Sequence, residues 1–411
     1  MASLSFAAAF PLFQLALGLA GLSCLYYLAV LFASLKFVLH KEASTDFTPP
    51  VSILKPVRGI EEDFYANLAS HCRQEYPCFE IIFGLGGPAG PEPDPSTDAS
   101  NLAASATAKD PALWTIAQLQ RDFPKTSIKT FVVPESRTPN SRGVNRKMNS
   151  LQHMLEAAAY DIVVIDDADI GVEPDYLRDL VQPLADERVG LVTCLYRGVP
   201  AGTLASLLEA LGISGDFAGQ VMLAQWLEGI KFALGATMAT RKKQIAEIGG
   251  LARWSDYLAD DYILGNRIAA AGYQVHLSRV VVETHLSHRS FSEVFRQQLR
   301  WARTIRFARP QGYLGLLLTF GVPFAVLAVI LRPHSALGQG ALALTLAVRW
   351  LAAWACGALV CRDGVIRNFF WLLPLRDLLA FGVWIASFFG SQVTWRGERF
   401  KLAPGGKISP A

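Results

Sequence analysis

Three acidic residues follow an apolar run in the middle of the chain. The run covers residues 162–165 and ends in Asp166-Asp167-Ala168-Asp169, which predicts a buried strand with carboxylates at its carboxyl end. Asp167 and Asp169 can both address one hard cation, and Mg²⁺ or Mn²⁺ held by one or two carboxylates completes its shell with substrate phosphates and water. Such a cation would stabilise a departing sugar diphosphate, whose charge grows as the glycosidic bond breaks. The alternative is an acidic turn that caps the helix beginning near Pro174.

A second acidic pair, Asp260 and Asp261, opens a stretch whose apolar residues recur at helical spacing. A sugar-accepting hydroxyl is barely acidic, so its attack on an anomeric carbon requires a positioned carboxylate to take its proton. We predict that Asp261 is this general base. Adjacent side chains diverge by about 100° on a helix, so Asp260 should not share the role. The alternative is that the two acids only complement the helix dipole.

Gln297-Gln298-Leu299-Arg300-Trp301 lies in a predicted helix from Ser292 to Arg306. Gln297, Arg300 and Trp301 share a face by their spacing, and an amide, an arginine and an aromatic ring there can line an acceptor pocket and bind diphosphate oxygens. The alternative is an arginine-rich amphipathic helix lying on anionic headgroups. Both interpretations can apply to different faces of this helix.

A globular α/β domain over residues 48–290 is expected to position these side chains. Strands are predicted at 51–54, 80–84, 128–133 and 162–165, with helices at 64–72, 113–123 and 148–155 between them. Alternation of strand and helix predicts a parallel sheet, whose ligands bind beyond the carboxyl ends of the strands. The stretch 86–109 is rich in Gly, Pro, Ala and Ser, which predicts a flexible surface insert.

The composition points to a membrane protein. Hydrophobic residues make up 52%, charged residues 18%, and the mean hydropathy is +0.28; this charge content is below the roughly 25% of soluble proteins. Residues 6–38 are long enough to span a bilayer. Basic residues follow this run and none precedes it, which favours a retained anchor with the next domain in the cytoplasm over a cleaved signal peptide.

Three further apolar segments, at 313–331, 340–360 and 369–389, form a predicted C-terminal membrane block over 313–390, preceded by an amphipathic helix over 291–310 on the acceptor side. The last segment is followed by basic residues, Arg396, Arg399, Lys401 and Lys407, which favour a cytoplasmic C-terminal end. One of the three segments should therefore not cross. We expect it to be the third, because Arg376 and Asp377 interrupt it and an unpaired charge in lipid costs ~2.5–3.5 kcal/mol. Arg349 in the second segment can reach another helix or the headgroups.

The sequence argues against a nucleic-acid interface, a cysteine-based framework or site, and a histidine metal site. A net charge of +3, with no basic stripe carrying interleaved aromatics, excludes a nucleic-acid partner. Six scattered cysteines indicate reduced thiols rather than a disulfide framework or a zinc site. His285 and His288 follow an apolar strand and can complete a metal site, but surface histidines are more common in such loops. We do not assign them to the site.

Taken in order, Lys55-Pro56-Val57-Arg58-Gly59, Asn145-Arg146-Lys147-Met148-Asn149, Asp167, Asp261 and Gln297-x-x-Arg300-Trp301 resemble the ceramide glucosyltransferase family, which includes bacterial hopanoid-associated glycosyltransferases. The resemblance covers essentially the whole chain. It implies a GT-A (Rossmann-like) fold, a UDP-sugar donor, inversion at the anomeric carbon and a lipid alcohol acceptor. It also implies that Lys55 and Lys147 bind substrate and that Asp110 contacts the nucleotide.

Two positions depart from the family pattern. The 86–109 insert separates Asp110 from the second strand, so Asp94 is a rival for the nucleotide contact. Thr193 stands where animal ceramide enzymes place a histidine, and its Cys-Leu-Tyr-Arg-Gly context looks more like the bacterial branch. Glucose or N-acetylglucosamine, and ceramide or a hopanoid polyol, all remain open.

These observations together predict an inverting, multi-pass membrane glycosyltransferase whose catalytic domain faces the cytoplasm, in a bacterial inner membrane. The rival enzyme is a processive polysaccharide synthase, because Gln-x-x-Arg-Trp occurs in cellulose- and hyaluronan-synthase-like enzymes too. The rival outside enzymes is a membrane scaffold that binds sugar nucleotides without turnover.

Overall fold

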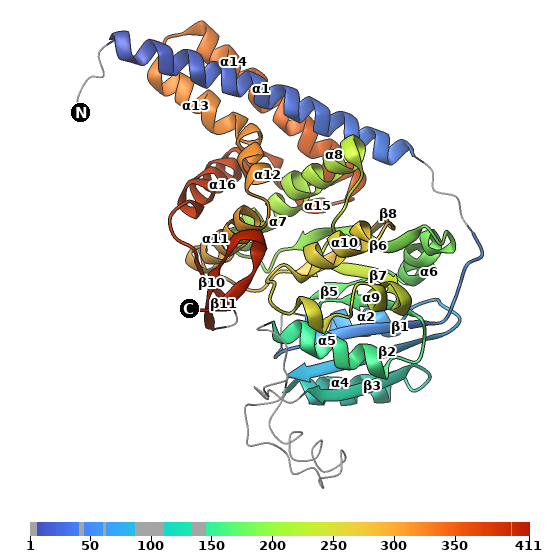
Figure 1. Ribbon diagram of the computed structural model, residues 1–411. Coiled ribbons are helices and arrows are strands. Elements are labelled where there is room, and N and C mark those ends of the chain that lie inside the picture. The colour runs from blue at the N-terminus through green and yellow to red at the C-terminus, as the bar shows by residue number, and fades with distance from the viewer. Residues whose placement is uncertain (1–5, 41–44, 61–62, 87–110, 134–144, 396) are drawn as a thin grey trace.

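The computed structural model describes residues 6–40, 45–60, 63–86, 111–133, 145–395 and 397–411 (Figure 1). Asp94, Asp110 and all of the predicted flexible insert except Gly86 lie outside these residues.

An eight-stranded sheet forms the centre of the globular part, in the order β3-β2-β1-β4-β7-β6-β8-β5. Its strands are β1 (Val51–Val57), β2 (Phe79–Gly86), β3 (Ser127–Val133), β4 (Ile162–Asp166), β5 (Ile170–Gly171), β6 (Val189–Val199), β7 (Thr237–Arg241) and β8 (Gln274–His285). The first four are parallel, as the alternation of strands and helices predicts. The sheet as a whole is mixed, because β7 runs antiparallel to both of its neighbours and β5 is antiparallel to β8.

Helices cover both faces of this sheet. One face packs against α2 (Phe64–Cys72), α4 (Pro111–Asp122) and α6 (Tyr176–Val181), which η1 (Gln182–Ala185) follows. The other face packs against α5 (Arg146–Ala157), α8 (Ala218–Glu228), α9 (Lys242–Glu247) and α10 (Asp260–Ala270), with the short η3 (Ala252–Trp254) beside them. Every residue of β1 and β4 is buried, as expected for parallel strands covered on both sides. The carboxyl end of β4 therefore delivers polar residues at the edge of a rigid core.

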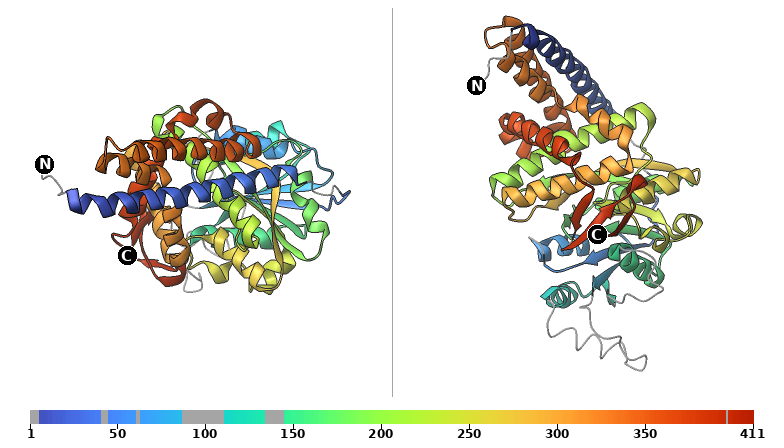
Figure 2. Two further views of the ribbon diagram at one scale, coloured as in Figure 1. Left: turned by 90° about the horizontal axis from the view of Figure 1, so that it is seen from above. Right: turned by 60° about the vertical axis from the view of Figure 1, so that its left-hand side comes forward.

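A bundle of apolar helices extends from one end of this domain (Figures 1 and 2). The long α1 (Phe6–Leu39) lies beside α13 (Gly321–Leu331) and α14 (Ala336–Ala353), and α14 continues as the π-helical η5 (Trp354–Val360). The Arg332 guanidinium, between α13 and α14, lies 4.8 Å from the ring centre of Phe10 and 5.3 Å from that of Phe13. The turn between α13 and α14 is thus next to the N-terminal part of α1, and the two helices form a hairpin that leads back to the domain.

Three described helices are long and apolar enough to cross a membrane, Phe10–Leu39, Ala336–Val360 and Gly364–Ser387. A bent pair, Pro310–Thr319 and Gly321–Leu331, makes a fourth candidate with a 55° break; it joins α12 (Pro310–Gly315) and η4 (Leu316–Thr319) to α13. The inner ends of α1 and η5 contribute Ala33, Cys356 and Val360 to the same buried cluster as the central strands. The bundle is therefore continuous with the core of the globular domain.

The last apolar segment lies against the domain. It contains α15 (Gly364–Phe369), η6 (Phe370–Leu372) and α16 (Leu373–Ser387), and Figure 1 shows α16 beside α11 (Phe291–Ala308). At one end of α16, Arg376 packs against Gly212 of α7 (Leu204–Gly212). At the other end, Arg303 and Arg306 of α11 donate to the backbone carbonyls of residues 388–390. The segment thus contacts the domain at both ends. It is also one of the helices long and apolar enough to cross a membrane, so its failure to cross stays a prediction.

The charges that interrupt the apolar segments pair with each other. The Arg349 guanidinium of α14 donates from Nε and Nη2 to the two carboxylate oxygens of Asp377, both at 2.9 Å. It also lies 3.2 Å from Asp216 in the π-helical η2 (Ile213–Phe217), with Arg376 3.9 Å from the same carboxylate. We call these four residues the membrane-side ion cluster. The main ion-pair partner of Asp377 is therefore Arg349 of another helix, and not its sequence neighbour Arg376.

A small antiparallel sheet closes the chain: β9 (Gln392–Trp395), β10 (Glu398–Leu402) and, after the turn η7 (Pro404–Gly406), β11 (Ile408–Pro410). The Ile408 amide donates to the Asp256 carbonyl at 2.7 Å, and Lys407 forms a β-bridge with Tyr257. The C-terminal residues thus lie on the same side of the apolar bundle as the globular domain.

Candidate active site

The chain after β4 presents two carboxylates at the edge of the sheet. The Asp167 side chain is 39% exposed, and the Asp169 carboxylate accepts a hydrogen bond from the Thr284 hydroxyl at 2.8 Å. Burial and then the nearby negative charge of Asp167 raise the pKa of Asp169. Two neighbouring carboxylates whose negative charges repel each other are suited to bind a shared cation.

Lys147 joins this edge to the acidic pair of α10. Its ammonium lies 2.7 Å from Asp167 Oδ1 and 3.0 Å from Asp260 Oδ2. Burial alone would lower the pKa of Lys147, but the charges of Asp167 and Asp260 reverse this and raise it. Asn145 fixes the position of Lys147, because its side chain accepts from the Lys147 amide at 3.0 Å and starts α5.

Asp261 lies beside this ion-paired group at the start of α10. One carboxylate oxygen accepts from the Tyr262 amide at 2.7 Å. A Cβ atom added to Gly235 would lie 3.0 Å from the second carboxylate oxygen of Asp261. The backbone of the 229–236 segment therefore closely approaches that oxygen at Gly235. Burial, followed by the negative charge of Asp260, raises the pKa of Asp261 to about 6. A carboxylate with a pKa near neutral is a more effective proton acceptor than one with an ordinary value.

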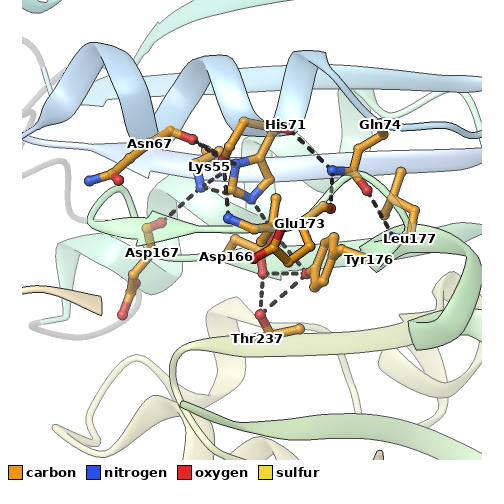
Figure 3. Close-up of polar contacts among 12 residues, drawn as sticks. Lys55, Asn67, His71, Gln74, Asp166, Asp167, Glu173, Tyr176, Leu177 and Thr237 are labelled. Carbon is orange, nitrogen blue, oxygen red and sulfur yellow. Dashed lines mark hydrogen bonds and ion pairs between the residues drawn. The ribbon is translucent and has the colours of Figure 1, made fainter. Parts of the chain in front are cut away.

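Buried polar side chains surround Asp166, the first residue of the Asp166–Asp169 turn (Figure 3). The Asp166 carboxylate accepts from Thr237 at 2.7 Å and from Tyr176 at 2.9 Å, and it lies 3.0 Å from His71 Nε2. Burial would raise the pKa of Asp166, but the hydrogen bond and charge of His71 and the charge of Lys55 lower it. Asp166 is therefore a charged anchor inside the domain, and its neighbour Asp167 is the one that faces outward.

Lys55, predicted to bind substrate, lies among these buried side chains. Its side chain is fully buried, and its ammonium donates to the Asp167 carbonyl at 2.9 Å and lies 3.2 Å from His71 Nε2. Burial lowers the pKa of Lys55 to about 8. In this geometry Lys55 acts on the site by fixing the backbone of Asp167. Direct contact with substrate stays a prediction.

The Gln297-x-x-Arg300-Trp301 segment lies in α11, which a capping box of Ser290 and Glu293 starts. The Gln297 amide donates to Glu209 Oε1 of α7 at 3.0 Å, and Arg289 donates to the Gln297 side-chain carbonyl. Trp301 is 36% exposed, and the Arg300 guanidinium lies 5.8 Å from the centre of its ring. The structure thus brings Gln297 to a polar group on α7 and leaves Trp301 at the surface. The predicted substrate contacts of Arg300 and Trp301 stay predictions.

Three residues that bear on the site were not assigned from the sequence. His71 and Tyr176 support Asp166, and Glu209 binds Gln297. Only Glu209 gives a sequence signal, as an acid within the apolar run 204–211. Thr193, at a departure from the family pattern, is fully buried and bonds the backbone of residues 234 and 237. Thr193 thus links β6 to the segment that contains Gly235.

No group of three or more His, Cys, Asp or Glu side chains among the described residues is arranged to hold a metal ion. Asp167 and Asp169 nevertheless fit the two-carboxylate type of site, in which phosphate oxygens and water supply the remaining ligands. The candidate metal ligands are thus acids that repel each other at a partly exposed edge.

Comparison with known proteins assigns the family. The sequence profile of glycosyl transferase family 21 matches residues 16–94 and 102–408. The chain belongs to this family. It is 24% identical over 407 residues to ceramide glucosyltransferase 3 of Caenorhabditis elegans, covering 94% of this chain and 80% of the relative. It is 22% identical over 402 residues to ceramide glucosyltransferase 1 of the same organism, covering 93% and 78%.

A solved structure supports the fold. The mannosyltransferase PcManGT of Pyrobaculum calidifontis, determined in complex with GDP-Man and Mn²⁺, superposes with a TM-score of 0.50 at 19% identity and covers 92% of this chain and 99% of its own. The predicted α/β GT-A fold, with an apolar N-terminal helix and apolar C-terminal helices, is therefore confirmed. The family 21 glycosyltransferase is ceramide glucosyltransferase-like.

Proposed function

We propose that this glycosyltransferase transfers a hexose, glucose or N-acetylglucosamine, from a UDP-sugar to a lipid hydroxyl such as that of ceramide or a hopanoid polyol. The observation that carries the proposal is the grouping of Asp167, Lys147, Asp260 and Asp261 at one sheet edge, in a domain continuous with a bundle of apolar helices. The group combines a cation-binding acid, a fixed ammonium and a separate base.

The donor half of the site is the edge that carries Asp167 and Asp169. Mg²⁺ or Mn²⁺ held there by the two carboxylates would supply charge stabilisation to the departing diphosphate. Lys147 supplies a positive charge from the protein itself at this position, because its ammonium lies between Asp167 and Asp260. Lys55 holds the Asp167 backbone in place from the buried interior of the domain.

The acceptor half of the site is the Asp261 carboxylate. With a pKa of about 6 it is ionised at neutral pH, and it takes the proton of the acceptor hydroxyl as that oxygen attacks the anomeric carbon. Attack from the face opposite the departing UDP inverts the configuration in one displacement. The adjacent Asp260 is neutralised by Lys147, which leaves the base role to Asp261.

The apolar helices support a membrane location. The proposed topology has α1, the bent α12–α13 pair and α14–η5 crossing a bacterial inner membrane, with α16 at its cytoplasmic surface beside the catalytic domain. A reporter fused after Ala411 should be active only on the cytoplasmic side. Activity only on the opposite side would require α16 to cross and would reject this topology.

The test of the reaction is the lipid extract of cells that express the protein, compared by mass spectrometry with cells expressing Asp261→Asn. The wild type should add lipids whose mass is raised by one hexose or one N-acetylhexosamine, and the variant should not. A folded wild-type protein that produces no new glycolipid from either acceptor class would reject the proposed function.

A further inference from the structure

Glu209 is an acid buried between the catalytic edge and the membrane helices. Its side chain is 1% exposed. It lies on α7, whose apolar residues Leu208 and Leu211 pack against Ala353, Ile366 and Leu373 of the membrane block. A carboxyl group in such surroundings is costly to bury unless its oxygens have partners.

Within the described part of the chain, only one of the two carboxyl oxygens of Glu209 has a partner. Oε1 accepts from the Gln297 amide at 3.0 Å and lies 3.8 Å from the Arg289 guanidinium. Oε2 is buried and has no hydrogen-bond partner among the described residues. Unpaired buried oxygens are few in native proteins, and each one requires a reason. Gln297 belongs to the segment predicted to contact the acceptor, which suggests that the reason is a ligand.

Helix α7 packs close to the end of β8 that carries a site residue. Ala210, next to Glu209, lies in one buried cluster with Leu286, and Tyr196 packs against this cluster. Thr284, two residues before Leu286, donates to Asp169. Burial and then the negative charges of four acids, Asp261, Asp169, Asp167 and Glu209, raise the pKa of Tyr196. Its ring packs against Phe217 of η2 at 5.3 Å between centres, and Phe217 packs against the core cluster that contains Cys356 and Val360 of η5. A lipid whose chain lies against the apolar helices and whose hydroxyl reaches Asp261 would bring its polar end to this region.

We propose that the unpaired oxygen of Glu209 accepts a hydrogen bond from a second donor of the lipid acceptor, a hydroxyl or amide N–H next to the hydroxyl that is glycosylated. This inference rests on the proposed function, since it requires a lipid alcohol as acceptor. Ceramide and hopanoid polyols share this chemistry, whereas a plain long-chain alcohol lacks it. Glu209 would then select a class of lipid while Asp261 activates the reacting oxygen.

The test uses two probes, a long-chain vicinal diol and its ether in which only the second hydroxyl is methylated. Glu209→Gln is the main variant, because its carbonyl can still accept from Gln297 while the free atom changes from an acceptor to a donor. Glu209→Asp, which keeps the charge and withdraws the free oxygen by one methylene, is the second variant. Glu228→Gln, an exposed acid on the neighbouring α8, is the matched control.

Wild-type protein in nanodiscs should prefer the diol over the ether by about 10–100-fold in kcat/KM, the range expected when a buried polar group loses its partner. Both Glu209 variants should reduce this preference to near unity without changing the KM of the UDP-sugar, and Glu228→Gln should keep it. An equal loss with both probes would mean that Glu209 only positions Gln297 and would overturn the proposal. An unchanged preference would overturn it as well.

Binding of the two probes without donor separates this inference from the proposed function. Tighter binding of the diol that depends on Glu209, with no sugar transfer, would retain the recognition site and reject the transferase reaction. Sugar transfer to both probes with equal binding would retain the reaction and reject the recognition site.

Discussion

At the sheet edge, the described residues place four acids, Asp167, Asp169, Asp260 and Asp261, near two ammonium groups. Lys147 pairs with Asp167 and Asp260, Lys55 donates to the Asp167 carbonyl, and the Asp167 side chain stays partly exposed. In the membrane-side ion cluster, two arginines face two aspartates, and the Arg349 and Asp377 side chains are each 2% exposed. The first group has an excess of negative charge and an acid whose pKa is raised to about 6. The second is balanced in charge. The difference indicates that incomplete charge pairing marks the proposed ligand site, and complete charge pairing marks a structural contact between helices.

The largest effect on stability should come from removing an arginine of the membrane-side ion cluster. Arg349→Met leaves Asp377 and Asp216 without their main partner and should lower the free energy of unfolding by ~3–5 kcal/mol. Thermal unfolding in detergent measures this change. The double variant Arg349→Met/Asp377→Leu removes both charges and should be more stable than the single variant. Equal loss in both would show that packing, and not the ion pair, maintains this contact.

Loss of the base should affect the reaction and not the fold. Asp261→Asn should lower kcat by a factor of ~10² or more, the usual scale of general base catalysis, with nearly unchanged UDP-sugar binding. Asp256→Asn is the control, since Asp256 is exposed and nearby. Wild-type turnover in Asp261→Asn would remove Asp261 from its assigned role.

Loss of a metal carboxylate should act on donor binding. Asp167→Ala should weaken Mn²⁺-dependent binding of the UDP-sugar by at least about 10–100-fold, because losing a proposed direct ligand should cost no less than losing an outer-shell partner. Titration of the donor with Mn²⁺ and with a chelator measures the effect. If the chelator weakens donor binding in Asp167→Ala as strongly as in the wild type, the cation is held elsewhere.

The pH profile should report the base of the free enzyme. The raised pKa of Asp261, about 6, means that the active carboxylate is lost as the pH falls through this value. Below pH ~6, kcat/KM should fall about tenfold per unit, as expected for one essential base. A flat profile from pH ~7 down to pH ~5 would contradict the assignment.

The smallest effect on activity should come from a methyl group added next to Asp261. Gly235→Ala adds a methyl group within 3.0 Å of an Asp261 oxygen and should lower kcat by a few-fold to about tenfold, since small displacements of catalytic groups are costly. Gly340→Ala has open space around the new Cβ and is the matched control. Full activity in Gly235→Ala would show that the backbone of the 229–236 segment shifts to accommodate the methyl group without displacing Asp261.

The sequence predicted the first four strands and the helices between them because apolar periodicity and strand length determine such units locally. It identified the charges that interrupt the third apolar segment, but it did not identify the main partner of Asp377, which is Arg349, 28 residues away. Lys55 shows the same limit. Its residue type suggests a surface position, yet β1 is buried on both faces and carries it into the core. Pairings of this kind depend on tertiary contacts that periodicity does not encode.

The contact of the C-terminal sheet with residues 256 and 257 also bears on biosynthesis. Lys407 and Ile408 complete the backbone pairing of this segment, just ahead of Asp260 and Asp261. Because chains are synthesised from the N-terminal end, the ribosome makes these partners long after the segment itself. The loop before the base therefore acquires its final pairing only after the membrane helices have been translated, so an incomplete chain still being inserted lacks that support.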